Sequence, residues 1–257
     1  MANLTQHMRA LHRMFTPPRF KVSETGGFSI AYRPATADEK VIEQSFRHPV
    51  FPVAGYQPRA DDTILNIGAH IGCFAVPASS YVPMGQVHAV EASRGTYNLL
   101  NANIALNGTD NVRAHHLALS DKDGTAELYH DLAGNWGHST VAKLSSRAET
   151  VRAQTLEQFF ARHSIERVHF AKLNCEGAEF PILLSAPVAT LRAIDLLHIL
   201  IHCDLAETYR LEQLTEKLLA ADFDLDVKTN AKRRGRIVAT RRLRSGHGTS
   251  GARTSLS

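Results

Sequence analysis

Short apolar segments alternate with amphipathic segments along the chain from Thr63 onward. Five segments are rich in Val, Ile and Leu and have the length of strands buried on both faces of a parallel sheet. They are Thr63–Ile67, Gln86–Val90, Val112–Leu117, Val168–Leu173 and Leu196–Ile201. Helical patterns lie at Cys73–Tyr81, Arg94–Leu106, Thr155–His163, Phe180–Leu184 and Ala206–Ala221. This alternation predicts repeated βα units, and therefore an α/β fold with helices on both faces of the sheet.

Near the C-terminus the pattern changes to two neighbouring strands. Phe223–Lys228 and Arg236–Thr240 are joined by a basic turn, which predicts an antiparallel hairpin at the edge of the sheet. With the five segments above, the hairpin makes a mostly parallel, seven-stranded, Rossmann-like sheet.

We expect three regions in the chain. Residues 1–60 form an extension with an amphipathic helix in residues 1–20, a strand at Phe28–Arg33 and a helix near Asp38. Residues 61–244 form the main domain. Within it, residues 120–154 are too long for a simple connection, and long connections inside compact domains tend to be functional. Residues 245–257 are Gly-, Ser- and Thr-rich and are expected to be disordered.

Composition adds limits on location and partners. Hydrophobic residues make up 44% of the chain and charged residues 21%, which is typical of globular proteins. No apolar run approaches the roughly 20 residues of a membrane span, and Met1–Thr16 lacks the apolar core of a secretion signal. We therefore expect a cytoplasmic protein with no membrane partner.

The net charge of +4 belongs to one end of the chain. Nine of the 29 basic residues and none of the 25 acidic ones lie from Lys228 onward, which leaves 20 against 25, or about −5, before it. These basic residues could contact phosphates, but a solvated hairpin and tail explain them more simply. A nucleic-acid partner is therefore not favoured.

The candidate cofactor site follows the first strand of the main domain, at Asn66-Ile-Gly-Ala-His-Ile-Gly72. Gly68 allows a tight turn at the strand end, and Gly72 allows close packing where a helix begins. The spacing is G-x-x-x-G rather than the G-x-G-x-x-G that makes room for a pyrophosphate. The next strand ends at Glu91, whose carboxylate can accept both ribose hydroxyl protons of a nucleoside. The pattern therefore favours S-adenosylmethionine over a dinucleotide.

With these residues identified, the chain resembles the FkbM family of class I methyltransferases from about Phe28 to Thr240. The family's loop, acid, N-V and A-L-S-D segments correspond to Asn66–Gly72, Glu91, Asn111-Val112 and Ala118-Leu-Ser-Asp121, and its K-I-D-x-E-G-A-E motif to Lys172-Leu-Asn-Cys-Glu-Gly-Ala-Glu179. The resemblance implies methyl transfer from S-adenosyl-L-methionine, usually to an oxygen. It places the cofactor against Asn66, Gly68, Ala69, His70, Gly72, Glu91, Ala92, Ser93, Ala118, Ser120 and Asn174.

Three positions depart from the family pattern. The family's two Asp residues are Asn66 and Asn174 here, and its Asn is His70. An amide keeps an acceptor oxygen but loses the charge that would attract a sulfonium or an ammonium. The alternatives are weaker cofactor binding, an acid supplied from elsewhere, or a catalytically degenerate protein that acts as a binding partner or scaffold.

The candidate catalytic residues are Glu176, His202 and His138. Glu176 follows the fourth strand and serves either as a base or as a cap of the helix that starts near Gly177. His202 ends the fifth strand, where Asp204 is close enough in sequence to orient it. His138 lies in the inserted segment, where a loop could cover the acceptor.

No metal site is expected, although the chain has 14 histidines. Adjacent His115 and His116 should point to opposite faces of a strand, and no H-x-x-x-H helix pair or Cys/His cluster appears.

The leading hypothesis is O-methylation of a hydroxyl on a small molecule or glycan. A non-catalytic binding protein and a nucleic-acid methyltransferase are the alternatives. The sequence leaves the oligomeric state open, with a dimer as one option.

Overall fold

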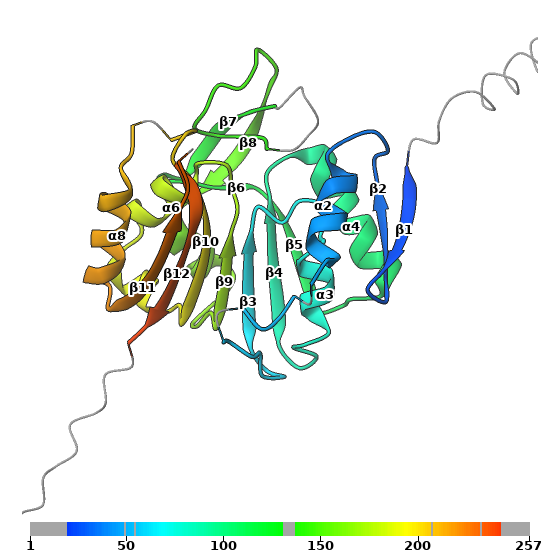
Figure 1. The fold of residues 1–257 in the computed structure, drawn as a ribbon, viewed down its shortest axis with the longest axis horizontal. Helices are drawn as coiled ribbons and strands as arrows, with labels where there is room; N and C mark the ends of the chain where they lie inside the picture. Colours follow the sequence, from blue (N-terminus) through cyan, green and yellow to red (C-terminus); the bar gives the residue numbers. More distant parts are fainter. Residues whose placement is uncertain are drawn as a thin grey trace, which may run out of the picture.

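The computed structural model describes residues 20–48, 50–53, 55–130, 137–206, 208–231 and 233–242. The helix expected in residues 1–20 and the tail expected at 245–257 lie outside the described residues, apart from Phe20. Figure 1 shows a central twisted sheet with helices on both of its faces. None of the helices in the described ranges is long and apolar enough to cross a membrane.

The central sheet has seven strands in the order β11-β12-β10-β9-β3-β4-β5. Their bounds are β3 Thr63–Ile67, β4 Gln86–Glu91, β5 Val112–His116, β9 Phe170–Leu173, β10 Leu196–His202, β11 Phe223–Thr229 and β12 Arg234–Arg241. Strand β12 pairs antiparallel with both β10 and β11, and the other pairings are parallel. The predicted sheet, its hairpin and its Rossmann-like class are confirmed.

The strand order reverses at β3, whose neighbours are β4 on one side and β9 on the other. At such a reversal the connecting chains leave in opposite directions and open a crevice at the carboxyl ends of the strands. The residues that follow β3, β4 and β9 therefore meet at one place.

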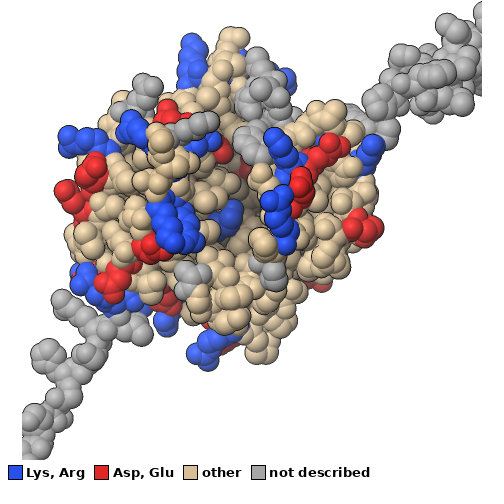
Figure 2. Space-filling view, in the orientation of Figure 1, with Lys and Arg blue, Asp and Glu red and all other residues tan. Residues whose placement is uncertain are grey.

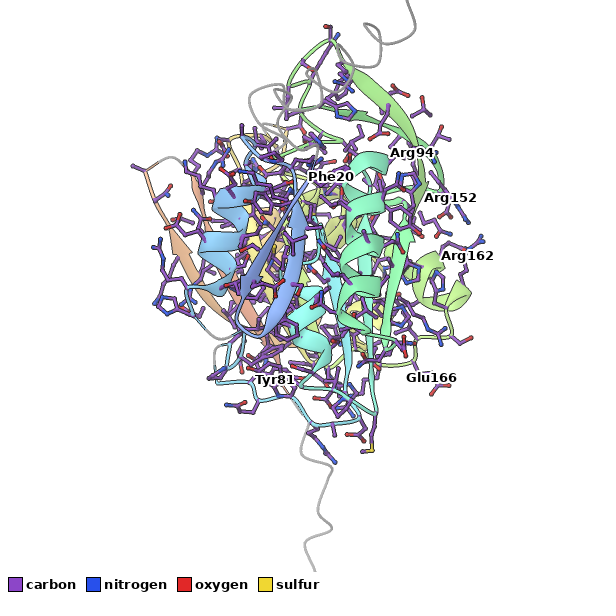
Figure 3. All side chains as sticks on the ribbon, turned by 90° about the vertical axis from the view of Figure 1, so that its right-hand side faces the viewer. Phe20, Tyr81, Arg94, Arg152, Arg162 and Glu166 are labelled. Atoms are coloured by element: carbon purple, nitrogen blue, oxygen red, sulfur yellow. The ribbon has the colours of Figure 1, made fainter. Side chains whose placement is uncertain are left out.

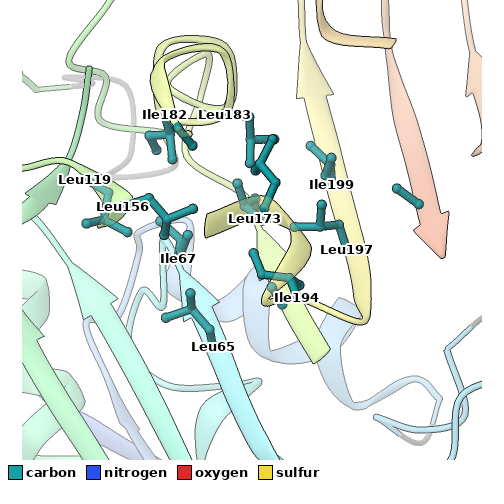
Figure 4. Packing of buried hydrophobic residues seen from close by; sticks show 14 of the residues in the cluster. Leu65, Ile67, Leu119, Leu156, Leu173, Ile182, Leu183, Ile194, Leu197 and Ile199 are labelled. Carbon is teal, nitrogen blue, oxygen red and sulfur yellow. The ribbon is translucent and has the colours of Figure 1, made fainter. Parts of the chain in front are cut away.

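Alternate residues of β3 enter different cores, as expected for a strand covered on both faces. Leu65 and Ile67 belong to a core that also contains residues of helices α5 Leu156–Arg162, α6 Glu179–Ser185, α7 Val188–Arg192 and α8 Leu211–Ala220. Figure 4 shows part of this core, where Leu173 and Leu197 lie beside Ile182 and Leu183. Ile64 packs on the other face against α3 Ala75–Ser79 and α4 Arg94–Asn107.

Some element boundaries differ from those predicted. The helix expected at Ala206–Ala221 begins only at Leu211, because the Tyr209 N–H donates to the Ala206 carbonyl in a turn and the Arg210 N–H donates to Gln213 Oε1. The helix expected at Cys73–Tyr81 shortens to α3. Helix α7 was not predicted.

The inserted segment forms a second, three-stranded sheet in the order β6-β8-β7. Its strands are β6 Ala118–Leu119, β7 Gly124–Tyr129 and β8 Ala148–Gln154. Figure 1 shows this sheet standing above the upper ends of β3 and β9. Strand β8 was not predicted, because most of its residues are polar and only part of it is buried.

The N-terminal extension packs against the main domain through α4. It consists of β1 Lys21–Thr25, which was not predicted, β2 Phe28–Tyr32 and α2 Asp38–Phe46. Figure 3 shows α2 and these two strands next to α4, with Arg94 at the end of α4 nearest the inserted sheet. The Arg94 N–H donates to Glu149 Oε1 of β8 at 3.3 Å. Helix α4 therefore connects the extension, the main sheet and the insertion.

Candidate active site

The loop after β3 is held between its two neighbouring strands. The N–H groups of Gly68 and Ala69 both donate to the Val90 carbonyl, and the Asn174 N–H donates to the Ile67 carbonyl. Gly68 has a φ of +75°, and a Cβ atom there would lie 2.0 Å from the Asn174 carbonyl oxygen. Only glycine satisfies both conditions, so the close approach of the loop to the end of β9 depends on this residue.

Glu91 at the end of β4 is held by backbone donors on both sides. The His70 N–H donates to Oε2 and the Ser93 N–H donates to Oε1, each at 2.9 Å. Burial raises the pKa of the Glu91 carboxyl, and these two hydrogen bonds oppose that effect. The second lone pairs of the two oxygens are free to accept hydroxyl protons from a ligand.

His70 is supported from the N-terminal extension. Its Nε2 lies 3.5 Å from Oδ1 of the fully buried Asp38. Arg33 in turn donates to both Asp38 oxygens at 2.8 Å and to Thr96 Oγ1 at 3.3 Å. Although burial raises the pKa of Asp38, the hydrogen bonds from Arg33 bring it below its ordinary value. The extension therefore helps to position the loop after β3. The sequence did not indicate this contact, because Arg33 and Asp38 do not form a recognisable motif with the loop.

A pocket lies at the carboxyl ends of β3, β4 and β9. It comprises about 790 Å³ of space, including space open to solvent. Of the predicted site residues, those lining it are Gly68, His70, Glu91, Ala92, Ala118, His138, Asn174 and Glu176. Figure 2 shows the surface hollowed near its centre, between α2 and the strands β10 and β12. Val41 of α2 and Thr96 of α4 also line the pocket and were not predicted.

The other predicted site residues lie behind the pocket wall. Ala69 packs in the core, Gly72 begins the turn into α3, and Ser93 is buried at the start of α4. The Ser120 N–H donates to the Gln154 carbonyl in the inserted sheet. Asn66 is fully buried, and neither atom of its side-chain amide has a hydrogen-bond partner among the described residues.

Glu176 follows β9 and lines the pocket from the other side of β3 than Glu91, which ends β4. Its φ is +50°, and a Cβ atom on Gly137 would lie 2.7 Å from the Glu176 carboxyl carbon. The buried Ser139 hydroxyl donates to the Glu176 carbonyl at 2.8 Å. The inserted segment therefore packs directly over Glu176. The alternative that Glu176 caps the following helix is wrong, because α6 begins at Glu179 and Glu179 accepts the free N–H groups there.

His202 is oriented by residues other than Asp204. Asp204 accepts a hydrogen bond from Arg234 Nε at 2.8 Å. His202 Nδ1 instead lies 3.1 Å from Glu179 Oε1, and its Nε2 lies 3.6 Å from Glu176 Oε1. The prediction that Asp204 orients His202 is wrong, since spacing along a strand end does not reveal partners from another element.

His138 lines the pocket from the inserted segment. Its ring lies 4.6 Å from that of His130, and His130 Nε2 lies 3.6 Å from Glu149 Oε1. In the ranges that the structure describes, no group of three or more His, Cys, Asp or Glu residues is arranged to hold a metal ion. The three cysteines are free thiols.

Comparisons with known proteins agree with this architecture. Residues 66–225 match the family model of the methyltransferase FkbM domain. A protein named Methyltransferase 1 from Beauveria bassiana is 25% identical over 186 residues, which cover 63% of this chain and 74% of that protein. The AMB antimetabolite synthetase AmbE of Pseudomonas aeruginosa is 23% identical over 251 residues, or 82% of this chain but only 12% of the synthetase.

Among solved structures, the methyltransferase FkbM from Methylobacillus flagellatus KT aligns with a TM-score of 0.52 at 13% identity. The alignment covers 75% of this chain and 48% of that one, and it shows a shared fold. The family model covers more than half of the chain and includes both the Gly68 loop and the Glu176 segment. The chain therefore belongs to the FkbM family of class I, S-adenosylmethionine-dependent methyltransferases.

Proposed function

We propose that the chain transfers a methyl group to a hydroxyl oxygen of a small molecule or sugar, with Glu176 as the base. The observation that carries this proposal is that one pocket is lined by both Glu91, which ends β4, and Glu176, which follows β9 on the other side of β3. Two carboxylates on different strands suit a nucleoside at one and an acceptor hydroxyl at the other.

The residues present fit S-adenosylmethionine. Glu91 offers a ribose a carboxylate that two backbone donors hold in place, and Gly68 lets the loop after β3 approach the end of β9 at the pocket wall. Ala92, Ala118 and Thr96 would surround the base and ribose, and His70 and Asn174 would lie nearer the methionine end. When bound, S-adenosylmethionine supplies a methyl group that its sulfonium makes electrophilic.

Glu176 would orient the acceptor hydroxyl and take its proton. The new oxygen–carbon bond forms as the sulfur–carbon bond breaks, the bonding electron pair stays on sulfur, and the hydroxyl proton goes to Glu176. Burial raises the pKa of Glu176 and the neighbouring His202 lowers it, with a net rise. A carboxyl group with a raised pKa is a stronger base, which favours proton removal from an alcohol. The backbone at Gly137 and the side chain of Leu128 would help to exclude water.

The names of the relatives support a biosynthetic acceptor. The bacterial relative is called an antimetabolite synthetase, and this chain is similar to a small part of it. A methyltransferase similar to such a part would act on a biosynthetic intermediate that carries a hydroxyl.

The proposal is tested by methyl transfer from radiolabelled S-adenosylmethionine to a panel of hydroxylated sugars and polyketide-like alcohols, with the site of methylation assigned by NMR. We expect an O-methyl product, and we expect Glu176→Gln to lower kcat by about 100-fold or more with little change in KM for S-adenosylmethionine. Asp204→Asn, which removes a neighbouring acid outside the pocket, serves as the control. Methylation at nitrogen or carbon, or full activity of Glu176→Gln, would contradict the proposal.

A further inference from the structure

Three side chains form a continuous row that begins at the pocket wall and runs away from it. Glu179 Oε1 lies 3.1 Å from Nδ1 of His202, and Nε2 of the same ring lies 3.6 Å from Oε1 of Glu176. Glu179 comes from the first turn of α6, His202 from the end of β10 and Glu176 from the loop after β9. Of the three, only Glu176 lines the pocket.

Glu179 is the most firmly held member of the row. Its side chain is fully buried, and it accepts hydrogen bonds from the N–H of Cys175 at 2.7 Å and of Gly177 at 2.9 Å. Both donors flank Glu176 in the chain. An ionised carboxylate can only accept hydrogen bonds, so the His202 nitrogen that faces it must carry a proton.

The proton on Nδ1 of His202 determines whether its Nε2, which faces Glu176, can accept or donate a hydrogen bond. With Nδ1 donating to Glu179, the neutral ring offers a lone pair at Nε2 and the charged ring offers an N–H there. Burial lowers the pKa of His202, but the hydrogen bond and charge of Glu179 outweigh it, and Glu176 adds to the rise. The charged ring would therefore face the Glu176 carboxylate.

We propose that Glu179 and His202 are positioning residues: Glu179 holds the charged ring of His202, and this ring holds Glu176 ionised and aimed at the acceptor. The proposal rests on the role of Glu176 proposed above. The acceptor proton still ends on Glu176, so His202 and Glu179 need not touch the substrate.

The other charged groups near the row come in a pair. Arg234 of β12 and Asp204, which follows β10, form an ion pair at 2.8 Å. Arg234 lowers the pKa of both His202 and Glu176, and Asp204 raises that of Glu176. Of the charged groups near His202, Glu179 is therefore the one whose loss should change the pKa of His202 most.

The first test is ¹⁵N NMR of the histidine rings in the full chain, titrated from pH 5 to pH 9 without cofactor or acceptor. His202→Gln identifies the signal. We expect Nδ1 of His202 to be protonated throughout, and Glu179→Gln, which keeps an acceptor oxygen for one of the two backbone donors, to weaken proton binding by His202 at least tenfold. Asp204→Asn should leave the His202 titration unchanged.

The second test uses the methyl transfer assay. The Glu179 charge itself raises the pKa of Glu176, but the His202 charge lowers it more strongly. If Glu179 acts through His202 on Glu176, Glu179→Gln therefore shifts the acidic limb of the kcat pH profile upward, because Glu176 loses the charged ring and ionises less readily. A merely structural role would lower kcat at every pH without moving the limb. The result that overturns the proposal is an unprotonated Nδ1 in the wild-type chain, or a His202 titration that Glu179→Gln leaves unchanged. Because the NMR result needs no acceptor, it stands apart from any failure of the proposed reaction.

Discussion

At the scale of single residues, the two amides that depart from the family pattern lie on either side of one lysine. Asn66 on β3 is in register with Lys172 on β9, and Asn174 follows two residues later, directly after the end of β9. The Lys172 ammonium lies 5.4 Å from the centre of the Phe74 ring. Burial lowers the pKa of Lys172 to about 8. Asn66 therefore lies beside a lysine within the sheet. It does not line the pocket, where the family resemblance had placed it.

Lys172, which is partly buried, predicts a pH dependence of stability. An unfolded lysine has a pKa of about 10.4, whereas folding lowers that of Lys172 to about 8. Between these values the unfolded chain holds a proton that the folded chain has lost, so the free energy of unfolding should rise with pH. The slope should approach 1.4 kcal/mol per pH unit at most (about one proton).

Urea unfolding at pH 7 to 9.5 measures this effect. Lys172→Met should be more stable than the wild type at pH 7 and should lose the rise above pH 8. Lys122→Met, at an exposed position, should keep the wild-type slope. A wild-type slope that survives in Lys172→Met would rule out Lys172 as its source.

At the scale of elements, two asparagines of α4 pair with a strand as a neighbouring strand would. Asn103 accepts from the Ala31 N–H and donates to the Ala31 carbonyl, and Asn107 does the same for Ser29. Asn103 also donates to the Ile71 carbonyl in the cofactor loop at 2.7 Å. Hydrophobic periodicity predicted both β2 and α4. It could not predict how they pair, because two polar residues four apart on a helix usually face solvent.

Removing the Asn103 side chain should destabilise both the N-terminal extension and the loop after β3, because it bonds to each of them. Asn103→Ala leaves two N–H or C=O groups of β2 and one carbonyl of the loop without partners, and each such loss costs about 1–3 kcal/mol when buried. We expect a loss of stability of about 2–4 kcal/mol and weaker cofactor binding, measured by urea unfolding and calorimetry.

The same helix provides the control. Asn101 is exposed, and its side chain donates to the Tyr97 carbonyl one turn earlier. Asn101→Ala should change stability by less than about 0.5 kcal/mol. If Asn103→Ala lowered stability no more than Asn101→Ala, the Asn103 hydrogen bonds would not hold the extension in place.

At the scale of the whole molecule, the sequence predicted the architecture better than the contacts within the site. The strands were predictable because those of the central sheet are short and mostly apolar, and the loop and Glu91 because glycine and acid must follow particular strands. Asp38, Thr96 and Glu179 were assigned no role in the site, since each acts through a partner distant in the sequence. The fold thus brings an extension, a central sheet and an insertion around one pocket.

Binding of S-adenosylmethionine to this pocket through Glu91 can be measured by isothermal titration calorimetry with S-adenosylhomocysteine. We expect saturable binding to the folded wild-type chain. We also expect affinity lowered about 10- to 100-fold in Glu91→Ala, because hydrogen bonds to a charged carboxylate contribute about 1.5–3 kcal/mol. Glu157→Ala, on the exposed side of α5, should bind as the wild type does. No binding by folded wild-type protein, or unchanged affinity in Glu91→Ala, would contradict binding through Glu91.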